Sequence, residues 1–405
     1  MNQLFKMAFR DLGRNRRRSF FSALALGMGL ALLLLMASVI TGEMESSMES
    51  SIRLQSGHLQ IRAANYIEAR SSLTWEDLVV DPAQIAAQVA ALAPVKVATP
   101  RLYISGIISV SDENRGVRVI GIDPASAANA PYRDGMLSGT FLTADDRDGI
   151  LIGKPLAEIL ELKAGDKANL LVNTSNGDVD QQLFTIRGIY TTNITGYDQI
   201  TVFMPLAKAQ TITKTENHAS ILFILLKDRE QTGAVVAAIQ PGGYEVKTWI
   251  QLNDLIVQIE DLSNSYMILL YLIILGITAT VIVNTFIMAV FERTREIGIL
   301  AAMGMHSRRI MAMFFAESSL LAVGGIVIGL IIGGLLVAYF TQYGFFIGNM
   351  GLNGAMIGDT IYAHLTLKDV LTLTTLTFVV SLLAALYPAL LAAQMEPVEA
   401  LRGGK

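Results

Sequence analysis

The sequence predicts an integral membrane protein of four transmembrane α-helices, with a large α+β extracytoplasmic domain inserted between helices 1 and 2. Four long stretches contain no charged residue: 19–42, 262–291, 318–358 and 370–395. About 20 predominantly apolar residues suffice to cross the hydrocarbon core of a bilayer as a helix. The long segment between the first and second stretches is rich in charged residues, so we expect it to fold in water.

These stretches set the expected order of transmembrane (TM) segments. Before and after TM1 (20–41) we expect a cytoplasmic amphipathic basic segment at 1–19 and the extracytoplasmic domain at 42–265. The remaining boundaries are TM2 at 266–290, a cytoplasmic coupling segment at 291–313, TM3 at 314–341, an extracytoplasmic loop at 342–369, TM4 at 370–394 and a cytoplasmic tail at 395–405. The apolar run of TM1 exceeds the roughly 7–15 residues of a signal-peptide core, so we expect a retained helix rather than a cleaved leader.

Basic residues near the spans predict the orientation. Residues 1–19 combine one lysine and five arginines with a single acidic residue, Asp11, and the segment after TM2 is also basic, through Arg293, Arg295, Arg308 and Arg309. Lys and Arg close to span ends remain in the cytoplasm. Both termini are therefore expected inside, and the domain at 42–265, which is net acidic, outside.

The basic run at 14–18 directly precedes TM1. A basic run could indicate nucleic acid, but at this place its ordinary role is to hold the cytoplasmic side against anionic lipid. Apolar residues give the same segment one apolar face, as expected of a helix that lies in the interface: Leu4, Phe5, Ala8, Phe9 and Leu12. We expect membrane lipid, and no nucleic acid, as its partner.

The extracytoplasmic domain is expected to mix strands and helices. Helices should follow three prolines that suit a first helical turn, Pro82, Pro155 and Pro205. Residues 149–190 look like a compact β-rich insertion. The chain has no cysteine, so the domain must fold without disulfides. Alternating or β-branched runs predict strands at 58–62, 97–110, 117–122, 182–190, 200–203 and 220–226.

Two apolar stripes with helical spacing run into the spans, one after TM1 and one before TM2. We interpret them as stalk helices that continue beyond the membrane, the alternative being ordinary core positions of the extracytoplasmic domain. The stalk residues are Met44, Met48, Ile52, Leu252, Leu255 and Ile259.

Small residues recur at every fourth position in two spans. This spacing lets helix backbones approach closely, so we expect these positions to contact another helix. Whether that helix belongs to this chain or to a second subunit stays open. The residues are Ala23, Gly27 and Ala31 in TM1 and Gly325, Gly329 and Gly333 in TM3.

Glu317 is the one carboxylate in a predicted span. It could be a proton or ion site, but it lies near the cytoplasmic end of TM3. An ion pair with Arg295, Arg308 or Arg309 is the simpler explanation.

Catalytic and metal-binding motifs are absent from the sequence. It contains no phosphate-binding loop, no His-Glu-x-x-His helix and no Gly-x-Ser-x-Gly elbow. Residues 145–149 superficially suggest a calcium loop, but Ala144 stands where the first ligand should be, and a solvated turn is the better interpretation. We therefore expect neither enzyme activity nor a bound metal or cofactor. The histidines are scattered and have the pattern of structural residues: His58, His218, His306 and His364.

The most specific motif is the connection between TM2 and TM3, residues 292–304, which read ERTREIGILAAMG. Together with the span order and the ending at 396–402, EPVEALR, it resembles the FtsX/MacB-like family of ABC transporter permeases over the whole chain. Segments 119–124, VIGIDP, and 151–157, LIGKPLA, are closest in appearance to the lipoprotein-releasing permeases LolC and LolE.

This resemblance implies a membrane subunit of an ATP-driven complex in the bacterial cytoplasmic (inner) membrane. A separate pair of cytoplasmic ATPase subunits would bind and hydrolyse ATP with Mg²⁺, and a second permease chain, identical or different, would complete the dimer. A short helix between TM2 and TM3 would dock on the ATPase, with apolar residues in a groove and charged ones at its rim. The docking residues so implied are Glu292, Arg293, Arg295, Glu296, Ile297, Leu300, Ala301 and Gly304.

Two functions stay open. The first is a permease that transmits ATP-driven motion to its extracytoplasmic domain (mechanotransmission) for lipoprotein release or for export of lipid or amphiphilic cargo. The second is a transmembrane regulator of an extracytoplasmic hydrolase or another partner. An extracytoplasmic carrier or adaptor would fit the first. An ion channel or proton-coupled carrier is disfavoured because the spans lack a set of midplane charges.

Overall fold

The structure, a computed structural model, describes residues 8, 10, 13–14, 16–67, 73–239, 242–348 and 356–396, without the side chain of Leu255. The expectations for the apolar face at 4–12, apart from Ala8, and for the tail from 397 onward lie outside the described residues. The chain divides into two compact units. The helical unit comprises Met1–Glu43, Glu260–Phe345 and Ile361–Lys405, and the sheet domain comprises Met44–Ile259 and Phe346–Thr360.

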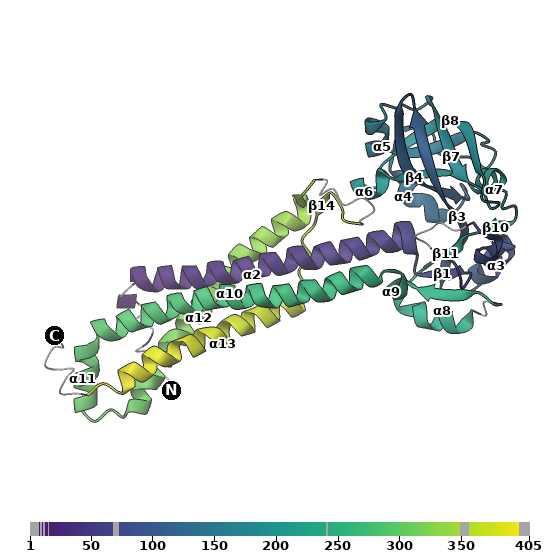
Figure 1. Cartoon of the computed structure of the whole chain (residues 1–405). Coiled ribbons are helices and arrows are strands. Elements are labelled where there is room, and N and C mark those ends of the chain that lie inside the picture. The colour runs from purple at the N-terminus through teal and green to yellow at the C-terminus, as the bar shows by residue number, and fades with distance from the viewer. Residues whose placement is uncertain are drawn as a thin grey trace. The chain divides into compact units, whose positions relative to one another are not determined.

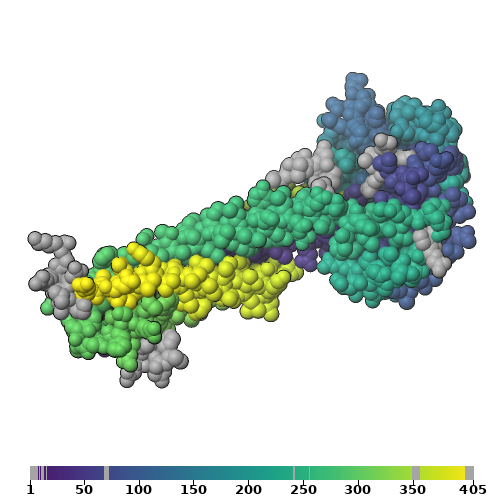
Figure 2. All heavy atoms as spheres, turned by 60° about the horizontal axis from the view of Figure 1, so that its bottom comes forward, coloured from purple at the N-terminus to yellow at the C-terminus, as the bar shows by residue number. Residues whose placement is uncertain are grey.

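From Arg16 onward, the described residues of the helical unit form four long helices and the short helix α11 (Figure 1; Figure 2). The helices α2, α10, α12 and α13 are long and apolar enough to cross a membrane, as the uncharged stretches predict. The short helix α11 lies between α10 and α12 in the sequence. The bounds are Arg16–Ser51 for α2, Asp254–Glu292 for α10, Thr294–Ala302 for α11, Ser307–Tyr343 for α12 and Leu367–Ala393 for α13.

All four helices are longer than the predicted spans, and α2 and α10 extend furthest beyond them. Helix α2 is followed without a break by the π-helical turn η1 (Ile52–Ser56) and ends at Gly57, whose φ of 65° suits glycine. The Gly57 N–H donates to the Ile52 carbonyl at 2.9 Å. Helix α10 begins at Asp254, ahead of the expected start of TM2. Neither extension contains a proline, so helical hydrogen bonding continues beyond the apolar stretch.

The sheet domain contains a ten-stranded mixed sheet. Its main path runs β12-β1-β11-β3-β4-β9-β6-β8-β5, and β7 pairs with β3 and β8. The strands are β1 (Leu59–Arg62), β3 (Val95–Val110), β4 (Glu113–Ile122), β5 (Met136–Gly139), β6 (Gly149–Gly153), β7 (Lys167–Asn173), β8 (Val179–Tyr190), β9 (Thr201–Pro205), β11 (Ile221–Leu226) and β12 (Glu245–Thr248). Two small sheets pair β2 (Val79–Val80) with β10 (His218–Ala219) and β13 (Phe345–Phe346) with β14 (Thr360–Ile361).

Apolar side chains are buried on both faces of the large sheet. Along β3, Leu102 and Ile104 belong to one apolar cluster and Tyr103 to another, and along β6 Ile150 and Leu151 separate in the same way. Alternate residues of a strand point to opposite faces, so a sheet covered on both sides needs nearly continuous apolar strands. Short helices lie around it: α3 (Pro82–Ala90), α4 (Ala130–Asp134), α5 (Lys154–Ile159), α6 (Thr195–Asp198), α7 (Leu206–Thr213), α8 (Thr232–Ala238) and α9 (Trp249–Leu252).

The prediction that residues 149–190 form a separate compact insertion is wrong. Strand β6 pairs with β9 and β8, and β7 pairs with β3, so this segment is part of the large sheet. The predicted hairpin is nevertheless present, with Gly177 at a φ of 83° in the turn between β7 and β8.

Candidate functional site

The coupling segment forms helix α11, whose two sides differ in exposure. Ile297 and Gly298 are buried, and Ile297 belongs to the apolar core of the helical unit. On the exposed side, the side chains of Ile299 and Met303 are 43% and 72% accessible, and Arg295 is exposed beside them. Residues at spacing i, i+4 share a helix face, so Arg295, Ile299 and Met303 form one surface, which we call the α11 face.

The predicted docking set is therefore only partly exposed. Ile297 packs inside the chain and is unavailable to a partner. Leu300 and Ala301 are half-buried, and Ala301 packs against the same core. Gly304 is exposed and has a φ of 88° in the turn that precedes α12. Sequence reasoning missed Ile299 and Met303 because apolar residues occur on both sides of α11. The pattern alone does not say which side packs against the rest of the chain.

Arg293 and Glu317 form a buried ion pair. Their side chains are 4% and 3% exposed, and Arg293 Nη1 lies 3.3 Å from Glu317 Oε2. The expected pairing of Glu317 with Arg295, Arg308 or Arg309 is thus wrong, because those three arginines are exposed. The placement of Arg293 at the rim of a docking surface is wrong as well. Arg293 lies between α10 and α11, where its side chain turns into the core and joins α12 to this corner.

The two glutamates of the coupling segment pair with the basic segment at the start of the chain. Arg14 Nη2 donates to both carboxylate oxygens of Glu296 at 2.9 and 3.0 Å. Arg18 Nη1 lies 2.5 Å from Glu292 Oε2. All four side chains are partly exposed, so each pair contributes little stability and serves mainly to hold the two segments together.

The small residues of α12 face those of α2 within this chain. A Cβ added at Gly329 would lie 2.8 Å from the Gly27 carbonyl oxygen, and one added at Gly325 would lie 2.9 Å from the Ala23 carbonyl oxygen. Gly333 lies against Ala31 in the same way. The backbones approach so closely that only glycine fits at these positions. The spacing in the sequence did not identify the helix that packs against these glycines, and the structure shows that it is α2 of the same chain.

The five described stalk side chains differ in burial: Met48 and Ile52 are buried, and Met44 and Leu252 are half-buried. Ile259 is 43% exposed, and the side chain of Leu255 lies outside the described residues. A polar contact joins the two stalk segments, because the Ser51 hydroxyl donates to the Asn253 side-chain oxygen.

The end of the α2–η1 segment is fastened inside the sheet domain. The Leu54 carbonyl accepts hydrogen bonds from Arg101 Nη1 at 2.8 Å and from the Tyr132 hydroxyl at 2.9 Å. Arg101, on β3, is fully buried and stacks over Phe223 with 3.6 Å between the guanidinium carbon and the ring centroid. A cation suits the carbonyl end of a helix, and the stacked ring compensates part of its lost hydration.

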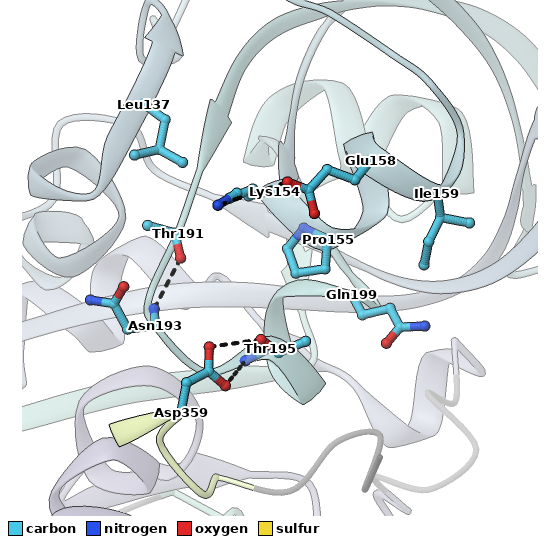
Figure 3. A pocket seen from close by; sticks show the side chains of 10 residues that line it. All are labelled: Leu137, Lys154, Pro155, Glu158, Ile159, Thr191, Asn193, Thr195, Gln199 and Asp359. Atoms are coloured by element: carbon cyan, nitrogen blue, oxygen red, sulfur yellow. Dashed lines mark hydrogen bonds and ion pairs between the residues drawn. The ribbon is translucent and has the colours of Figure 1, made fainter. Parts of the chain in front are cut away.

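The segment that links α12 to α13 is also attached to the sheet domain (Figure 3). Thr195 donates to Asp359 through its N–H at 3.2 Å and through its hydroxyl at 2.7 Å. The Asp359 N–H in turn donates to the Asn193 carbonyl at 3.0 Å. Met356, from the same segment, is buried in an apolar cluster of the domain that includes Tyr66. We call residues 356–360 the linker anchor.

A cavity of about 710 Å³ adjoins the linker anchor (Figure 3). Some polar groups of its lining contact one another: Lys154 Nζ lies 3.8 Å from Glu158 Oε1, and the Asn193 N–H donates to Thr191 Oγ1 at 3.1 Å. This arrangement contains no nucleophile paired with a base among its lining residues, which are Leu137, Lys154, Pro155, Glu158, Ile159, Thr191, Asn193, Thr195, Gln199 and Asp359.

Asp198 precedes Gln199, which lines this cavity, and the Asp198 carboxylate is buried. Burial raises its pKa to about 6, although hydrogen bonds from Thr192 and Thr191 oppose the shift. The Thr192 N–H and hydroxyl donate to Asp198 at 2.8 and 2.7 Å, and the Thr191 hydroxyl donates at 3.0 Å. The carboxylate thereby fixes the loop whose Asn193 carbonyl receives the linker anchor.

The residues first considered for metal binding have structural partners. In the suspected calcium loop, Asp146 is buried rather than solvated, and its Oδ1 accepts from Arg187 Nε at 3.0 Å. His58 Nδ1 accepts from the Leu226 N–H at 3.1 Å, and His218 packs edge-on against Trp75. No group of three potential ligands gathers anywhere in the described ranges.

Comparison with known proteins identifies the family. Residues 268–397 match the FtsX-like permease C-terminal domain, and residues 19–241 match the MacB-like periplasmic core domain. The chain therefore belongs to the ABC transporter permeases of the FtsX/MacB type. Its four apolar helices and its relatives indicate a bacterial inner membrane protein.

Two relatives show the extent of the similarity. The lipoprotein-releasing system transmembrane protein LolC of Neisseria meningitidis is 25% identical over 325 residues, which cover 75% of this chain and 77% of LolC. LolE of Haemophilus influenzae is 23% identical over 395 residues, which cover 94% of this chain and 93% of LolE. The crystal structure of the periplasmic region of MacB from Actinobacillus actinomycetemcomitans aligns with 52% of this chain and 97% of its own, at 12% identity and a TM-score of 0.36.

Proposed function

We propose that this chain transmits ATP-driven movement from a separate cytoplasmic ATPase to its sheet domain on the outer side of the membrane. The movement would release or propel lipoprotein, lipid or amphiphilic cargo. The family implies a partner ATPase and a permease dimer. The observation that carries the proposal is the α11 face, where Ile299 on the short helix α11 and Met303 directly after it are exposed between two candidate spans.

The α11 face has the composition of a docking surface. Ile299 and Met303 supply exposed apolar surface, which is unfavourable in water and can be buried by a partner, and Arg295 adds a charge beside them. The inner side of the same helix is held by Ile297 in the core and by the Arg293–Glu317 pair. A force applied to the α11 face would therefore reach α10 and α12 rather than bend a loose loop.

Transmission would follow the helices that contribute residues to both units. Helices α2 and α10 are each continuous across the boundary between the two units. The α2–η1 end is fixed by Arg101 and Tyr132, and Asn253 ties the start of α10 to Ser51. The linker anchor offers a second connection, because it attaches the α12–α13 linker to the same domain. Movement of rigid helices suits switching by domain motion rather than a pore.

The cargo is inferred from similarity. LolC and LolE are named as members of a lipoprotein-releasing system and align with most of this chain, which supports lipoprotein or another lipid-bearing cargo. Regulation of an extracytoplasmic hydrolase would use the same movement. Proteins that co-purify with the complex distinguish the two functions, since a carrier indicates transport and a hydrolase indicates regulation.

The docking proposal is tested with Ile299→Asp and Met303→Asp in the purified complex of this chain and its ATPase. A charge placed in an apolar contact should weaken assembly by about tenfold or more, because central apolar residues dominate interface energy. Affinity is measured by titrating the ATPase onto the chain in detergent or nanodiscs, together with ATP hydrolysis by the complex.

Ile299→Leu serves as the matched control, because it keeps the apolar surface at the same position. It should assemble within about twofold of the unmodified chain. If a folded Ile299→Asp/Met303→Asp protein assembles and supports hydrolysis as well as Ile299→Leu does, the α11 face is not the ATPase contact.

A further inference from the structure

The geometry points to a binding site for the phosphate of an anionic phospholipid at the amino-terminal end of α2. A cavity of about 610 Å³ opens there, within the helical unit. Four arginines and one glutamate contribute to its lining, which consists of Gly13, Arg14, Arg16, Arg17, Arg18 and Glu292. Nothing in the coupling mechanism uses this cavity.

The cavity has an uncompensated positive charge. Arg14 is paired with Glu296 and Arg18 with Glu292, so two of its four guanidinium groups are neutralised. Arg16 Nε donates to the Gly13 carbonyl, which carries no net charge. Arg17 is exposed, and within the described residues neither Arg16 nor Arg17 has a carboxylate at ion-pair distance. Among the described residues that line the cavity, a surplus of two positive charges remains for an anion.

Guanidinium groups bind a phosphate group with more specific geometry than they bind a diffuse negative surface. Their planar fork donates two parallel hydrogen bonds to phosphate oxygens, and each such contact is charge-assisted. Arg16 and Arg17 are neighbours in the sequence, beside the ion-paired Arg14 and Arg18. The two carboxylates already engaged hold the cavity walls in place, so binding needs little further ordering.

The next residues indicate that the phosphate belongs to a lipid. Phe20 and Phe21 follow the arginines after Ser19 and are 56% and 64% exposed, with their rings packed edge-on at 5.7 Å. They lie at the start of a helix long and apolar enough to span the membrane. Exposed aromatic rings at this level provide a surface for acyl chains, and a soluble phosphate would gain nothing from them.

An occupied site would act on the coupling segment. The ion pairs that border the cavity end on Glu292, the last residue of α10, and on Glu296 of α11. A phosphate bound by Arg16 and Arg17 offsets the repulsion among the four arginines and so favours the paired arrangement. Anionic lipid would then stabilise α11 for docking. This consequence rests on the proposed function, whereas lipid binding itself does not.

The test measures binding of phosphatidylglycerol to the purified full chain in neutral detergent, by native mass spectrometry and by titration of a fluorescent analogue. In Arg16→Gln/Arg17→Gln the affinity should fall about 30-fold, since each basic residue near an anionic headgroup contributes about a factor of five. Arg308→Gln/Arg309→Gln is the matched control, because it removes the same charge from another exposed pair near the start of α12. The control should lose less than about threefold.

Further arms identify the ligand and exclude misfolding. Phosphatidylcholine, which has no net charge, should bind weakly, and inorganic phosphate at millimolar concentration should not displace phosphatidylglycerol. Arg16→Lys/Arg17→Lys keeps the charge and should insert and bind within about tenfold of the unmodified chain, because only the bidentate geometry is lost. Equal losses in the Arg16/Arg17 and Arg308/Arg309 variants would overturn the site in favour of a diffuse basic surface. Displacement by inorganic phosphate would overturn the lipid as ligand.

Discussion

Asp198 is a single residue whose charge state affects the sheet domain. It is 1% exposed and holds the loop that receives the linker anchor. Burial raises its pKa to about 6, above the value near 3.9 expected in an unfolded chain. The folded state therefore binds the proton more tightly than the unfolded state does, and this group stabilises the fold more as the pH falls.

We predict that Asp198→Asn reduces the pH dependence of the sheet domain's stability. The contribution of Asp198 should be fully present below about pH 4 and lost as the pH rises through about 6, with a maximum near 3 kcal/mol. Asparagine has no charge to desolvate, so the stability of the variant relative to the unmodified chain should increase as the pH rises from 4.5 to 7.5. Thermal unfolding and hydrogen exchange, measured at pH 4.5 and at pH 7.5, check this. Asp112→Asn, at an exposed carboxylate, is the control. A constant difference between the Asp198→Asn and unmodified chains would contradict the assignment.

At the scale of elements, the contact between α2 and α12 depends on glycine. Gly325, Gly329 and Gly333 lie on the side of α12 that meets α2, whereas a Cβ at Gly334 would meet no atom within 4 Å. The two kinds of glycine occupy the same helix and the same apolar surroundings. They differ only in whether a neighbouring backbone excludes a side chain.

Gly329→Val should therefore destabilise the helical unit, while Gly334→Val should leave it nearly unchanged. At Gly329 the added atoms would meet the Gly27 carbonyl oxygen and Leu30 at less than 3 Å, and such overpacking typically costs about 1–3 kcal/mol. The two variants are compared by their midpoints of thermal unfolding in detergent. Unfolding is monitored as the loss of monodisperse protein on heating. Equal midpoints for Gly329→Val and Gly334→Val would show that the two helices separate without cost.

Particular elements show how much of the structure can be predicted from the sequence. The four long helices could be predicted because a membrane demands an uncharged run of a fixed minimum length, and strands such as β3 and β11 because their apolar runs are long. Strand pairing could not be predicted: β7 joins β3 across a long stretch of chain, so 149–190 looked independent. The buried Arg293–Glu317 pair and the exposure of Ile299 depend on tertiary packing, which local spacing does not contain.

At the scale of the whole molecule, the proposal requires the sheet domain and α11 on opposite sides of the membrane. The natural absence of cysteine allows single cysteines to report this. With Asp145→Cys and Ser307→Cys in separate chains, a membrane-impermeant thiol reagent on cells with any outer membrane permeabilised should label only the Asp145 position, because basic residues hold the other side in the cytoplasm. Labelling of Ser307→Cys but not Asp145→Cys would reverse the orientation.

The central claim is that events at the ATPase move the stalk segments, and a distance between them measures it most directly. Glu49 on α2 and Gln258 on α10 are both exposed and belong to the sheet domain, so spin labels on cysteines introduced there report the separation of the two helices by pulsed electron paramagnetic resonance. In the complex with its ATPase, addition of ATP and Mg²⁺ should shift the distance distribution, and Ile299→Asp/Met303→Asp should abolish the shift. An unchanged distribution, in a complex that binds ATP and hydrolyses it, would contradict transmission through these helices.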